Sequence, residues 1–390
     1  MPDTILPTTT DILIIGGGVM GASAAYHLAK RQAGRILLLE KQPFLGQGAT
    51  GKCAGGIRHQ FSTEVNIRLS TLSIQMMARF PEEMEQDIDL HFVGYLFLLS
   101  SEEQMADFRR NAELQRSLGI ETEILDREAI ARLAPLVNLD AEPVIIGGTN
   151  YERDGLADPN SVVQGYAKQA RRMGVDIRTD TPVRRILRQG DRIIGVETAD
   201  GQRIEAGVTL LAAGPWSGKL AATADFDLPV APLRRQIVVT RPMGIPRDMP
   251  FIIDFAQSLY FHYESGGILT GMSNPNETPG EKEDVDQDWT LYHLEKAIER
   301  FPLLEQAQLL TQWAGLYEVT PDHQAIIGKL PLEGFYTVTG FSGHGFMHGP
   351  VCGLLMAEEI LDGRAHTVNI DPLRYERFLT QELHPEKNVV

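Results

Sequence analysis

The feature that most restricts the fold of this chain is a glycine-rich turn close to its N-terminus. Residues 11–15 form a short apolar run, Gly16-Gly-Gly-Val-Met-Gly21 follows them, and residues 22–31 are good helix formers. A second apolar run over residues 36–40 ends in a glutamate. Strand, turn, helix and strand in this order predict a βαβ unit, and the apolar character of both runs indicates buried parallel strands.

The spacing of the three glycines indicates what the turn binds. Gly16 allows the tight turn, Gly18 lets the backbone approach a pyrophosphate, and Gly21 lets the helix pack closely on the sheet. Glu40 follows about 20 residues after the last glycine, where an acid accepts hydrogen bonds from ribose hydroxyls. The unit therefore predicts a dinucleotide site with phosphates at the helix N-terminus. The acid suits NAD and FAD equally, so the choice between them depends on other segments.

Length, charge and cysteine content limit the classes of protein to which this chain can belong and the partners that it can bind. The 390 residues suit two domains, and no apolar run reaches the roughly 18 residues that cross a bilayer. The N-terminus lacks a secretory pattern, so we expect a cytoplasmic protein. Cys53 and Cys352 are the only cysteines and the histidines lack metal-site spacing, so we expect neither a disulfide framework nor a metal. The net charge of −16 argues against nucleic acid or an anionic membrane as a partner.

Further elements are predicted along the whole chain. Helices are predicted at residues 62–80, 105–118, 127–133, 159–173 and 285–311, and from Pro350 to Leu361. Strands are predicted at residues 91–99, 183–187, 192–198, 208–213 and 335–339, and residues 228–275 alternate as in an antiparallel sheet. Nucleotide-type elements at the start, middle and end predict two interleaved domains.

Six segments of the chain resemble one family of flavoenzymes. They are GGGVMG (16–21), LLLEK (37–41), GATGKCAGGIRHQF (48–61), LLAAGPWS (210–217), YEVTPDHQAIIG (317–328) and GFSGHGFM (340–347). The order of these segments and their residue patterns resemble the D-amino-acid oxidase (DAO) superfamily. Within it, they resemble the branch with sarcosine oxidase β-subunits, dimethylglycine dehydrogenases and L-proline dehydrogenases. The resemblance implies an α/β fold, in which a Rossmann-like FAD-binding domain (1–90, 148–222 and 318–390) is interleaved with an α+β substrate domain built on an antiparallel sheet (91–147 and 223–317).

The same resemblance implies which residues contact FAD. They are Gly16, Gly18, Val19, Met20, Gly21, Glu40, Lys41, Gly48, Ala49, Thr50, Lys52, Cys53, Ala54, Gly55, Gly56, Val183, Ala213, Gly214, Trp216, Gly315, Gly343, His344, Gly345, Phe346 and Met347. A helix that begins near Pro350 would direct its N-terminus at the flavin N1–C2=O edge and stabilise negative charge there.

Two positions that carry covalent flavin in relatives are changed in this chain. Residues 315–322 resemble a segment of the monomeric sarcosine oxidases in which a cysteine carries the flavin. This chain has Gly315 in the place of that cysteine. Heterotetrameric sarcosine oxidases carry FMN on a histidine, and Pro159 stands in the similar place here. The resemblance therefore predicts noncovalent FAD.

The resemblance also implies catalytic residues near the flavin. Arg58 would hold a substrate carboxylate, with an interdomain salt bridge as its alternative. His344 would lie against the ring, and Tyr260 and Tyr317 would line the substrate cavity unless they serve core packing. His59 is either catalytic or a satisfied polar side chain beside the flavin.

Two departures from the oxidases bear on the electron acceptor. Met347 stands where sarcosine oxidases have a lysine after GFSGHGF, and Leu269 stands where the monomeric oxidases have a lysine that promotes reaction with oxygen. Positive charge beside the flavin favours superoxide formation, so the loss of both lysines favours a dehydrogenase over a fast oxidase. Met347 therefore belongs with the expected catalytic residues as a position that tunes reactivity.

The expected function is FAD-dependent oxidation of the C–N bond of a small amino acid. A secondary or N-methyl amine of the sarcosine, dimethylglycine or proline type is preferred, with hydride transfer to flavin N5 and hydrolysis of the resulting imine. One alternative is an oxidase of glycine or a D-amino acid, and another is an electron-relay flavoprotein subunit of a larger complex. The acceptor is a protein, a quinone or O2, and the need for a second subunit stays open.

Overall fold

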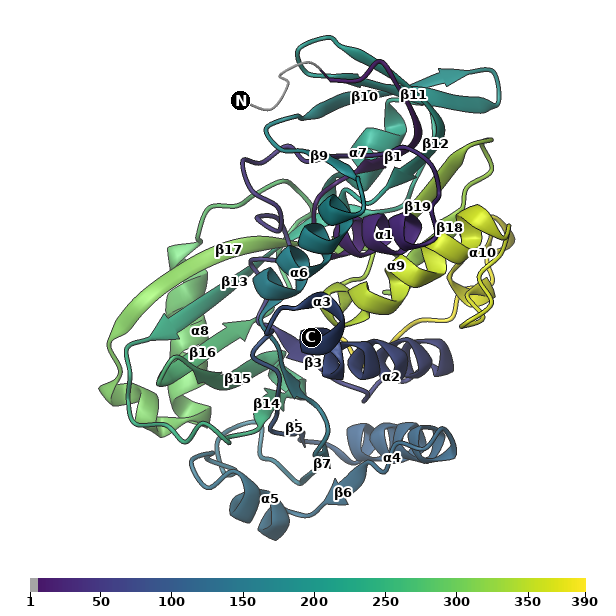
Figure 1. Cartoon of the computed structure of the whole chain (residues 1–390). Coiled ribbons are helices and arrows are strands. Elements are labelled where there is room, and N and C mark those ends of the chain that lie inside the picture. The colour runs from purple at the N-terminus through teal and green to yellow at the C-terminus, as the bar shows by residue number, and fades with distance from the viewer. Residues whose placement is uncertain (1–5) are drawn as a thin grey trace.

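The computed structural model describes residues 6–390 and confirms the predicted βαβ unit (Figure 1). Strand β1 (Thr9–Ile15), helix α1 (Val19–Lys30) and strand β2 (Ile36–Leu39) follow one another, and β1 and β2 pair in parallel. Nearly every residue of the two strands is buried, which explains why the sequence shows continuous apolar runs rather than alternation.

The first large sheet carries this unit. Its strand order is β10-β11-β12-β1-β2-β9, and β19 pairs with β12 and β18 at one side. The other strands are β9 (Asp176–Arg178), β10 (Val183–Gln189), β11 (Arg192–Thr198), β12 (Arg203–Leu211), β18 (Ile326–Lys329) and β19 (Phe335–Thr339). Strands β2, β1, β12 and β19 run parallel, so their carboxyl ends meet at one edge of the sheet.

The second large sheet has the order β17-β13-β16-β15-β14-β5-β7-β6 and is antiparallel except where β14 pairs with β5. Its strands are β5 (Tyr95–Leu99), β6 (Glu123–Leu125), β7 (Gly147–Tyr151), β13 (Ala231–Thr240), β14 (Phe251–Asp254), β15 (Leu259–Glu264), β16 (Gly267–Met272) and β17 (Leu309–Val319). Short strands β3 (Gly56–Ile57), β4 (His91–Phe92) and β8 (Gly155–Leu156) form a third sheet. One parallel-type and one antiparallel sheet confirm the predicted fold class.

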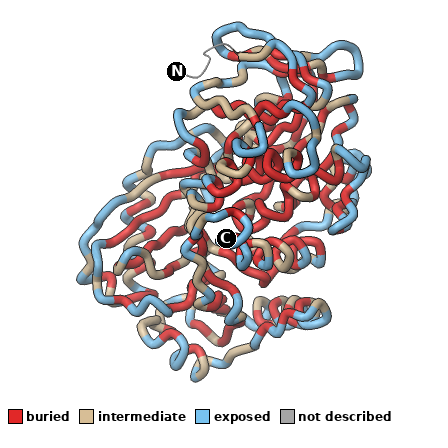
Figure 2. The backbone as a smooth tube through the Cα atoms, in the orientation of Figure 1, coloured by how far each residue is buried: buried red, intermediate tan, exposed pale blue. Residues whose placement is uncertain are grey.

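The helices pack around these sheets. They are α2 (Glu64–Ala78), α3 (Phe80–Met84), α4 (Glu102–Ser117), α5 (Arg127–Leu133), α6 (Pro159–Arg172), α7 (Ser217–Ala222), α8 (Gln287–Arg300), α9 (Gly345–Leu361) and α10 (Arg377–Thr380). Single turns of 3-10 helix lie at 214–216, 255–257, 302–306 and 371–373. Figure 2 shows the core as continuous buried backbone where α1, α6 and α9 meet the first sheet.

The predicted start of the last long helix was wrong. Helix α9 begins at Gly345, and Pro350 lies inside it. A proline this close to the start removes only one helical hydrogen bond, and its carbonyl accepts from Ser23 Oγ at 3.1 Å. The earlier start moves the helix N-terminus into the GHGFM segment itself.

Two other predicted elements are shorter than expected. Residues 285–311 are not one helix, because α8 ends at Arg300 and Phe301 leaves the helical conformation, with φ −131° and ψ 79°, before Pro302. Residues 309–311 then begin β17. The strand expected over residues 91–99 is divided into β4 and β5.

The sheets show how the chain is shared between the two parts of the molecule. Strands of the first sheet come from residues 9–39, 176–211 and 326–339, whereas strands of the second come from 95–151 and 231–319. The domain limits stay a prediction, but β7 crosses the expected limit at residue 148 because it pairs with β5. Among residues 6–390, no helix is long and apolar enough to cross a membrane.

Candidate functional site

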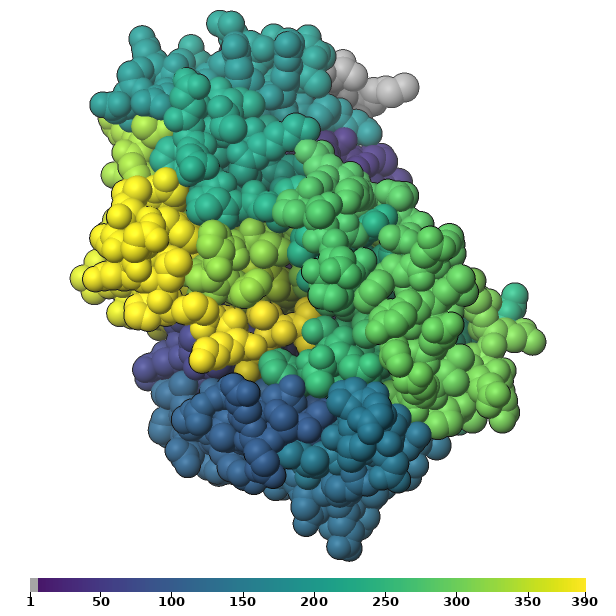
Figure 3. Space-filling view, turned by 180° about the vertical axis from the view of Figure 1, so that it is seen from behind, coloured from purple at the N-terminus to yellow at the C-terminus, as the bar shows by residue number. Residues whose placement is uncertain are grey.

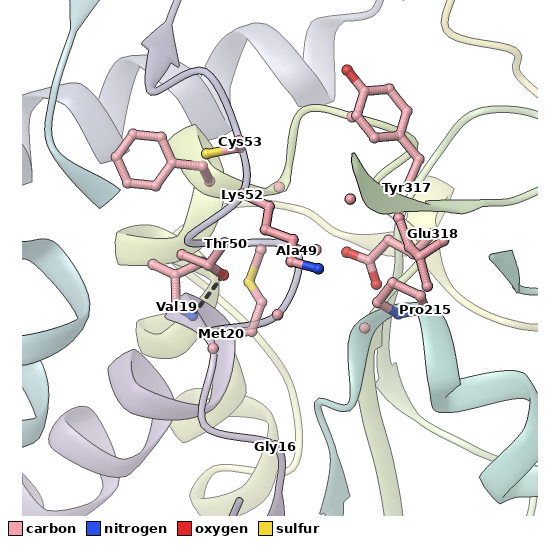
Figure 4. A pocket seen from close by; sticks show the side chains of 18 of the residues that line it. Gly16, Val19, Met20, Ala49, Thr50, Lys52, Cys53, Pro215, Tyr317 and Glu318 are labelled. Atoms are coloured by element: carbon pink, nitrogen blue, oxygen red, sulfur yellow. Dashed lines mark hydrogen bonds between the residues drawn. The ribbon is translucent and has the colours of Figure 1, made fainter. Parts of the chain in front are cut away.

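A cavity of about 390 Å³ lies where the two large sheets meet. It is lined by every residue expected to contact FAD except Gly21, and also by Arg58, Tyr260 and Tyr317. Figure 4 shows part of it, with Val19, Met20 and Thr50 on one wall and Pro215, Tyr317 and Glu318 on the other. The structure therefore brings together segments separated by about three hundred residues of chain.

The glycine-rich turn forms one end of this cavity. Gly16 has φ +109°, and a Cβ there would lie 2.3 Å from the carbonyl oxygen of Ala212. A Cβ at Gly21 would lie 1.9 Å from the carbonyl oxygen of Gly16. Gly21 is therefore needed for close packing of α1 on the turn, as expected, and this role explains why it does not line the cavity.

The N-terminus of α1 fits a pyrophosphate. Its first turn contains no acidic residue, and the N-cap residue Gly18 makes no side-chain capping bond. The backbone N–H of Val19 donates to Thr50 Oγ1 at 3.2 Å (Figure 4). The remaining free amides and the positive end of the helix dipole favour an anion at this place.

Glu40 lies on the cavity wall in a fixed position. Its Oε2 accepts from Gly17 N at 2.7 Å and its Oε1 accepts from Gln42 N at 2.8 Å. Each carboxylate oxygen keeps a lone pair for a further donor. The geometry fits the ribose contact that the sequence predicts.

Lys41 and Trp216, both expected at the cofactor, form a contact on the same wall. The Lys41 Nζ lies 3.0 Å from the centroid of the Trp216 ring, which is a cation–π arrangement. The Trp216 indole N–H donates to Glu281 Oε2 at 3.0 Å. Partial burial lowers the pKa of Lys41, which nearby glutamates partly offset.

Another part of the cavity wall is formed by the turn before α9. Gly343 has φ +105°, and a Cβ there would lie 2.4 Å from the Tyr317 ring. His344 is the N-cap residue of α9, whose first turn contains no acidic residue and no side-chain cap. Because Gly345 and Phe346 line the cavity, the free amides of this helix start can stabilise a negative charge inside it.

His344 is a buried polar side chain without partners. Its ring is 1% exposed, and neither Nδ1 nor Nε2 makes a hydrogen bond within residues 6–390. Burial, and then repulsion from His348, hold its pKa well below the usual value, so the ring is neutral. Buried polar atoms are normally satisfied, so these two nitrogens fit a ligand with polar groups on its ring edge.

Two tyrosines, Tyr260 and Tyr317, lie on the cavity wall. Burial raises the pKa of Tyr260 well above its ordinary value and also raises that of Tyr317. Both phenols therefore stay protonated and can donate hydrogen bonds. This placement on the wall agrees with the cavity role expected for them.

Arg58 lies on the wall with much of its hydrogen-bonding capacity already used. Nη1 donates to the carbonyl of Gln60 at 2.6 Å and Nη2 donates to the carbonyl of Asn388 at 2.5 Å. Its guanidinium stacks over Phe61, with Cζ 3.8 Å from the ring centroid. The structure shows neither the alternative interdomain salt bridge nor a freely available guanidinium, and its carboxylate role stays a prediction.

His59 lies behind this wall and does not line the cavity. Its Nδ1 lies 2.6 Å from Asp154 Oδ1, and its backbone N–H donates to the same oxygen at 2.8 Å. Asp154 is fully buried. The geometry therefore favours the satisfied polar side chain and does not support His59 as a catalytic residue.

Several lining residues were not found from the sequence. Arg235, Glu318, Tyr95, Val389 and Val390 all lie on the cavity wall. Glu318 accepts hydrogen bonds from Thr339 Oγ1 at 2.7 Å and Gly340 N at 3.0 Å, and burial raises its pKa. The sequence signal for Glu318 was its place next to Tyr317, whereas the two valines carry no motif at all.

The segment that contains these valines is held firmly against the site. The Glu386 carboxylate accepts from Ser62 N at 2.8 Å, Thr63 Oγ1 at 2.8 Å and Asn66 Nδ2 at 3.0 Å. Asn388 also accepts from Asn111 Nδ2 at 3.2 Å. Figure 3 shows C-terminal residues (yellow) crossing the surface beside residues of the second sheet region (blue).

No cluster of three or more histidine, cysteine or carboxylate side chains with metal-site geometry occurs within residues 6–390. Gly315, which stands where some relatives bear a flavin-linking cysteine, lines the cavity. A Cβ at Gly315 would lie 3.0 Å from the Lys52 Cβ. Pro159 begins α6 and does not line the cavity.

Comparisons with known proteins agree with this geometry. The family model described as FAD dependent oxidoreductase (DAO) matches residues 11–359. The chain is 31% identical to FAD-dependent oxidoreductase domain-containing protein 1 of Xenopus laevis, covering 98% of this chain and 85% of that protein. It is 28% identical to sarcosine oxidase subunit beta of Arthrobacter sp, covering 96% and 93%. The crystal structure of L-proline dehydrogenase from P.horikoshii superposes with a TM-score of 0.88 at 31% identity, covering 97% of this chain and all of that one.

Proposed function

Because this chain belongs to the DAO family of FAD-dependent oxidoreductases, we propose that it oxidises the C–N bond of a small amino acid. The preferred substrate is a secondary or N-methyl amine of the sarcosine, dimethylglycine or proline type. Bound FAD would supply the acceptor for a hydride from the carbon beside the amine nitrogen, and water would hydrolyse the imine that is left after the nitrogen loses a proton.

One observation carries this proposal. A single cavity connects the dinucleotide turn at Gly16 with a chamber in which guanidinium and phenol groups gather. The α9 N-terminus lies between these ends, with its first amides free of side-chain caps. The cavity offers an anion site at the dinucleotide turn, free amides that can stabilise a reduced ring, and cationic guanidinium groups. These three features fit an amino acid held beside a flavin.

The chain's own residues have distinct roles in this proposal. The amides at the start of α9 stabilise negative charge as the ring system is reduced. The absence of a side chain at Gly343 lets the Tyr317 ring approach that turn closely. The neutral His344 ring supplies polar contacts without adding a charge. The Tyr260 and Tyr317 hydroxyls orient the substrate by hydrogen bonding.

We further propose that electrons pass to a protein or a quinone rather than rapidly to O2. Met347 lies on the cavity wall in the first turn of α9 and is 5% exposed, so this position is apolar. Leu269 is 3% exposed and packs with Ile237, which lines the cavity. Neither position supplies the positive charge that would stabilise superoxide.

The function is tested by anaerobic mixing of the purified holoprotein with sarcosine, dimethylglycine, proline, glycine and D-alanine. We expect bleaching of the visible flavin absorbance by at least one secondary or N-methyl amine, and little or none by glycine and D-alanine. Bleaching by glycine or D-alanine alone would favour the primary amino-acid oxidase. A flavin that none of the five reduces would favour the electron-relay subunit.

We propose noncovalent FAD, because glycine occupies position 315 on the cavity wall and offers no side chain for a bond to the ring. Acid precipitation of the holoprotein should leave the yellow colour in the supernatant, with the spectrum of FAD. Mass spectrometry of the pellet should then give the mass of the unmodified chain. Colour retained in the washed pellet would refute noncovalent binding.

A further inference from the structure

Two adjacent arginines on β13 have opposite environments. Successive side chains of a strand point to opposite faces, so Arg234 and Arg235 lie on different sides of the sheet. Arg234 is paired with three acidic residues: its Nε lies 2.7 Å from Glu277 Oε2, and its Nη atoms lie 3.2 Å from Asp284 Oδ2 and from Asp286 Oδ2. Arg235 lines the cavity, and no carboxylate of residues 6–390 lies within 4.0 Å of its guanidinium.

Arg235 is also short of hydrogen bonds. Nη1 donates to the carbonyl of Arg234 at 3.0 Å, but Nε is buried and, within the described residues, has no acceptor. A buried donor without a partner costs free energy, and more so when it is charged. Burial lowers the pKa of Arg235, which the nearby Tyr317 partly offsets. The group nevertheless remains charged at any physiological pH.

The residues around Arg235 fix the position of its guanidinium but do not accept all of its hydrogen bonds. Its Cζ lies 5.0 Å from the centroid of the Tyr317 ring, which holds the guanidinium plane by a cation–π contact. β13 pairs Arg235 with Gly315 of β17, which has no side chain of its own at this position. The guanidinium is therefore fixed in the cavity wall and charged, and its Nε has no acceptor among the described residues.

Arg58 offers much less to a carboxylate. Both of its Nη groups donate to backbone carbonyls, at 2.6 Å and 2.5 Å, and the Phe61 ring covers one face. Each Nη group keeps a second N–H, but the guanidinium is already bound to the carbonyls of Gln60 and Asn388. Among the described residues, the Arg235 guanidinium donates only to the carbonyl of Arg234.

We propose that Arg235 is the residue that holds the substrate's carboxylate, through its guanidinium, and that it selects amino acids over amines without a carboxylate. This inference rests on the proposed function, because it names the group that positions the amino acid in the same cavity. Tyr317 fixes the guanidinium plane, and Arg58 instead anchors the segment that includes Asn388. Arg235 is thus a specificity-determining residue that motif comparison does not mark.

The inference can be tested by ligand binding without turnover. The probe is 2-furoate, a small carboxylate without an amine, and its uncharged counterpart is 2-furamide. Both are titrated into the holoprotein, and binding is followed by the change in flavin absorbance and by the shift in melting temperature. We expect Arg235→Met to raise the Kd of 2-furoate roughly 100-fold while changing that of 2-furamide less than about twofold, because only the first loses a charge-assisted hydrogen bond.

Three further variants make the result specific. Arg235→Lys keeps the charge but not the planar guanidinium edge, so it should bind 2-furoate with an intermediate Kd. It replaces Arg235→Met as the test variant if that protein does not fold. Arg241→Met removes an exposed charge just beyond the same strand and should leave both probes unchanged. Arg58→Met should weaken both probes to a similar extent.

Two results would overturn the inference. One is an unchanged ratio of the two Kd values in the Arg235 variants, and the other is a loss specific to 2-furoate in Arg58→Met alone. Failure of every amine to reduce the flavin would refute the proposed function, yet the ratio for the two probes would still be readable. The two failures are therefore distinguishable.

Discussion

Replacement of Gly16 with alanine is expected to weaken FAD binding at least about 100-fold. The residue has φ +109°, and the new Cβ would lie 2.3 Å from the carbonyl oxygen of Ala212. Backbone strain of this kind costs about 1–3 kcal/mol, and relief of the clash must move the turn away from the pyrophosphate. A loss of about 2.7 kcal/mol corresponds to 100-fold in Kd. The measurement is the FAD content of the purified protein, followed by titration of apoprotein with FAD.

Gly174→Ala is the matched control for this variant. Gly174 also has a positive φ, +91°, but a Cβ there would meet no atom within 4 Å. This variant should lose only about 1 kcal/mol of unfolding free energy and keep its FAD. Equal FAD content in the two variants would contradict the role assigned to the turn.

The second large effect is expected from Met347→Lys, which should speed the reaction of the reduced enzyme with O2 at least about tenfold. An attraction of about 1.4 kcal/mol between a new cation and the forming superoxide is sufficient for a tenfold change. Met347 is 5% exposed, so the introduced ammonium is desolvated and its pKa is lowered. The acceleration should therefore grow as the pH falls through that lowered pKa, because only the protonated lysine attracts an anion.

The measurement is the rate of flavin reoxidation after anaerobic reduction, with peroxide release as a second readout. Met347→Leu keeps the volume without adding a charge and should reoxidise as slowly as the unsubstituted protein. Fast peroxide release by the unsubstituted protein would show that the apolar residue does not restrain the reaction. Equal acceleration in both variants would show that packing, not charge, sets the rate.

Local patterns were sufficient to predict much of the fold, including the glycine-rich turn, whereas most of the residues expected at FAD came from the resemblance to the DAO superfamily. The turn at 16–21 could be found because its glycines are required by backbone geometry, which is a property of consecutive residues. The signal for helix α5 also lies in consecutive residues, and the predicted bounds of this helix match the structure. The start of α9 was misplaced because Pro350 was expected at the first turn of the helix, whereas a proline near a helix start removes only one backbone hydrogen bond and can lie inside the helix.

The substrate end could not be derived in the same way, because its residues meet only through long-range packing. Nothing in the sequence distinguishes Arg234 from its neighbour Arg235. The two differ in the structure because Arg234 alone pairs with acidic residues of the segment 277–286. Val389 and Val390 reach the cavity through the contacts of Glu386 with residues 62–66. No local pattern contains the information that places these segments side by side.

The interleaved connectivity of the first sheet has a consequence for how the protein is made. Strand β1 pairs with β2 locally, but its other neighbour is β12, and β12 in turn pairs with β19. Such non-local pairing raises the contact order and slows folding. Because α9 supplies Gly345, Phe346 and Met347 to the cavity wall, the cavity is complete only after this helix has been synthesised. Until then the glycine-rich turn lacks its partners, and the apolar strands β1 and β2 are exposed to aggregation.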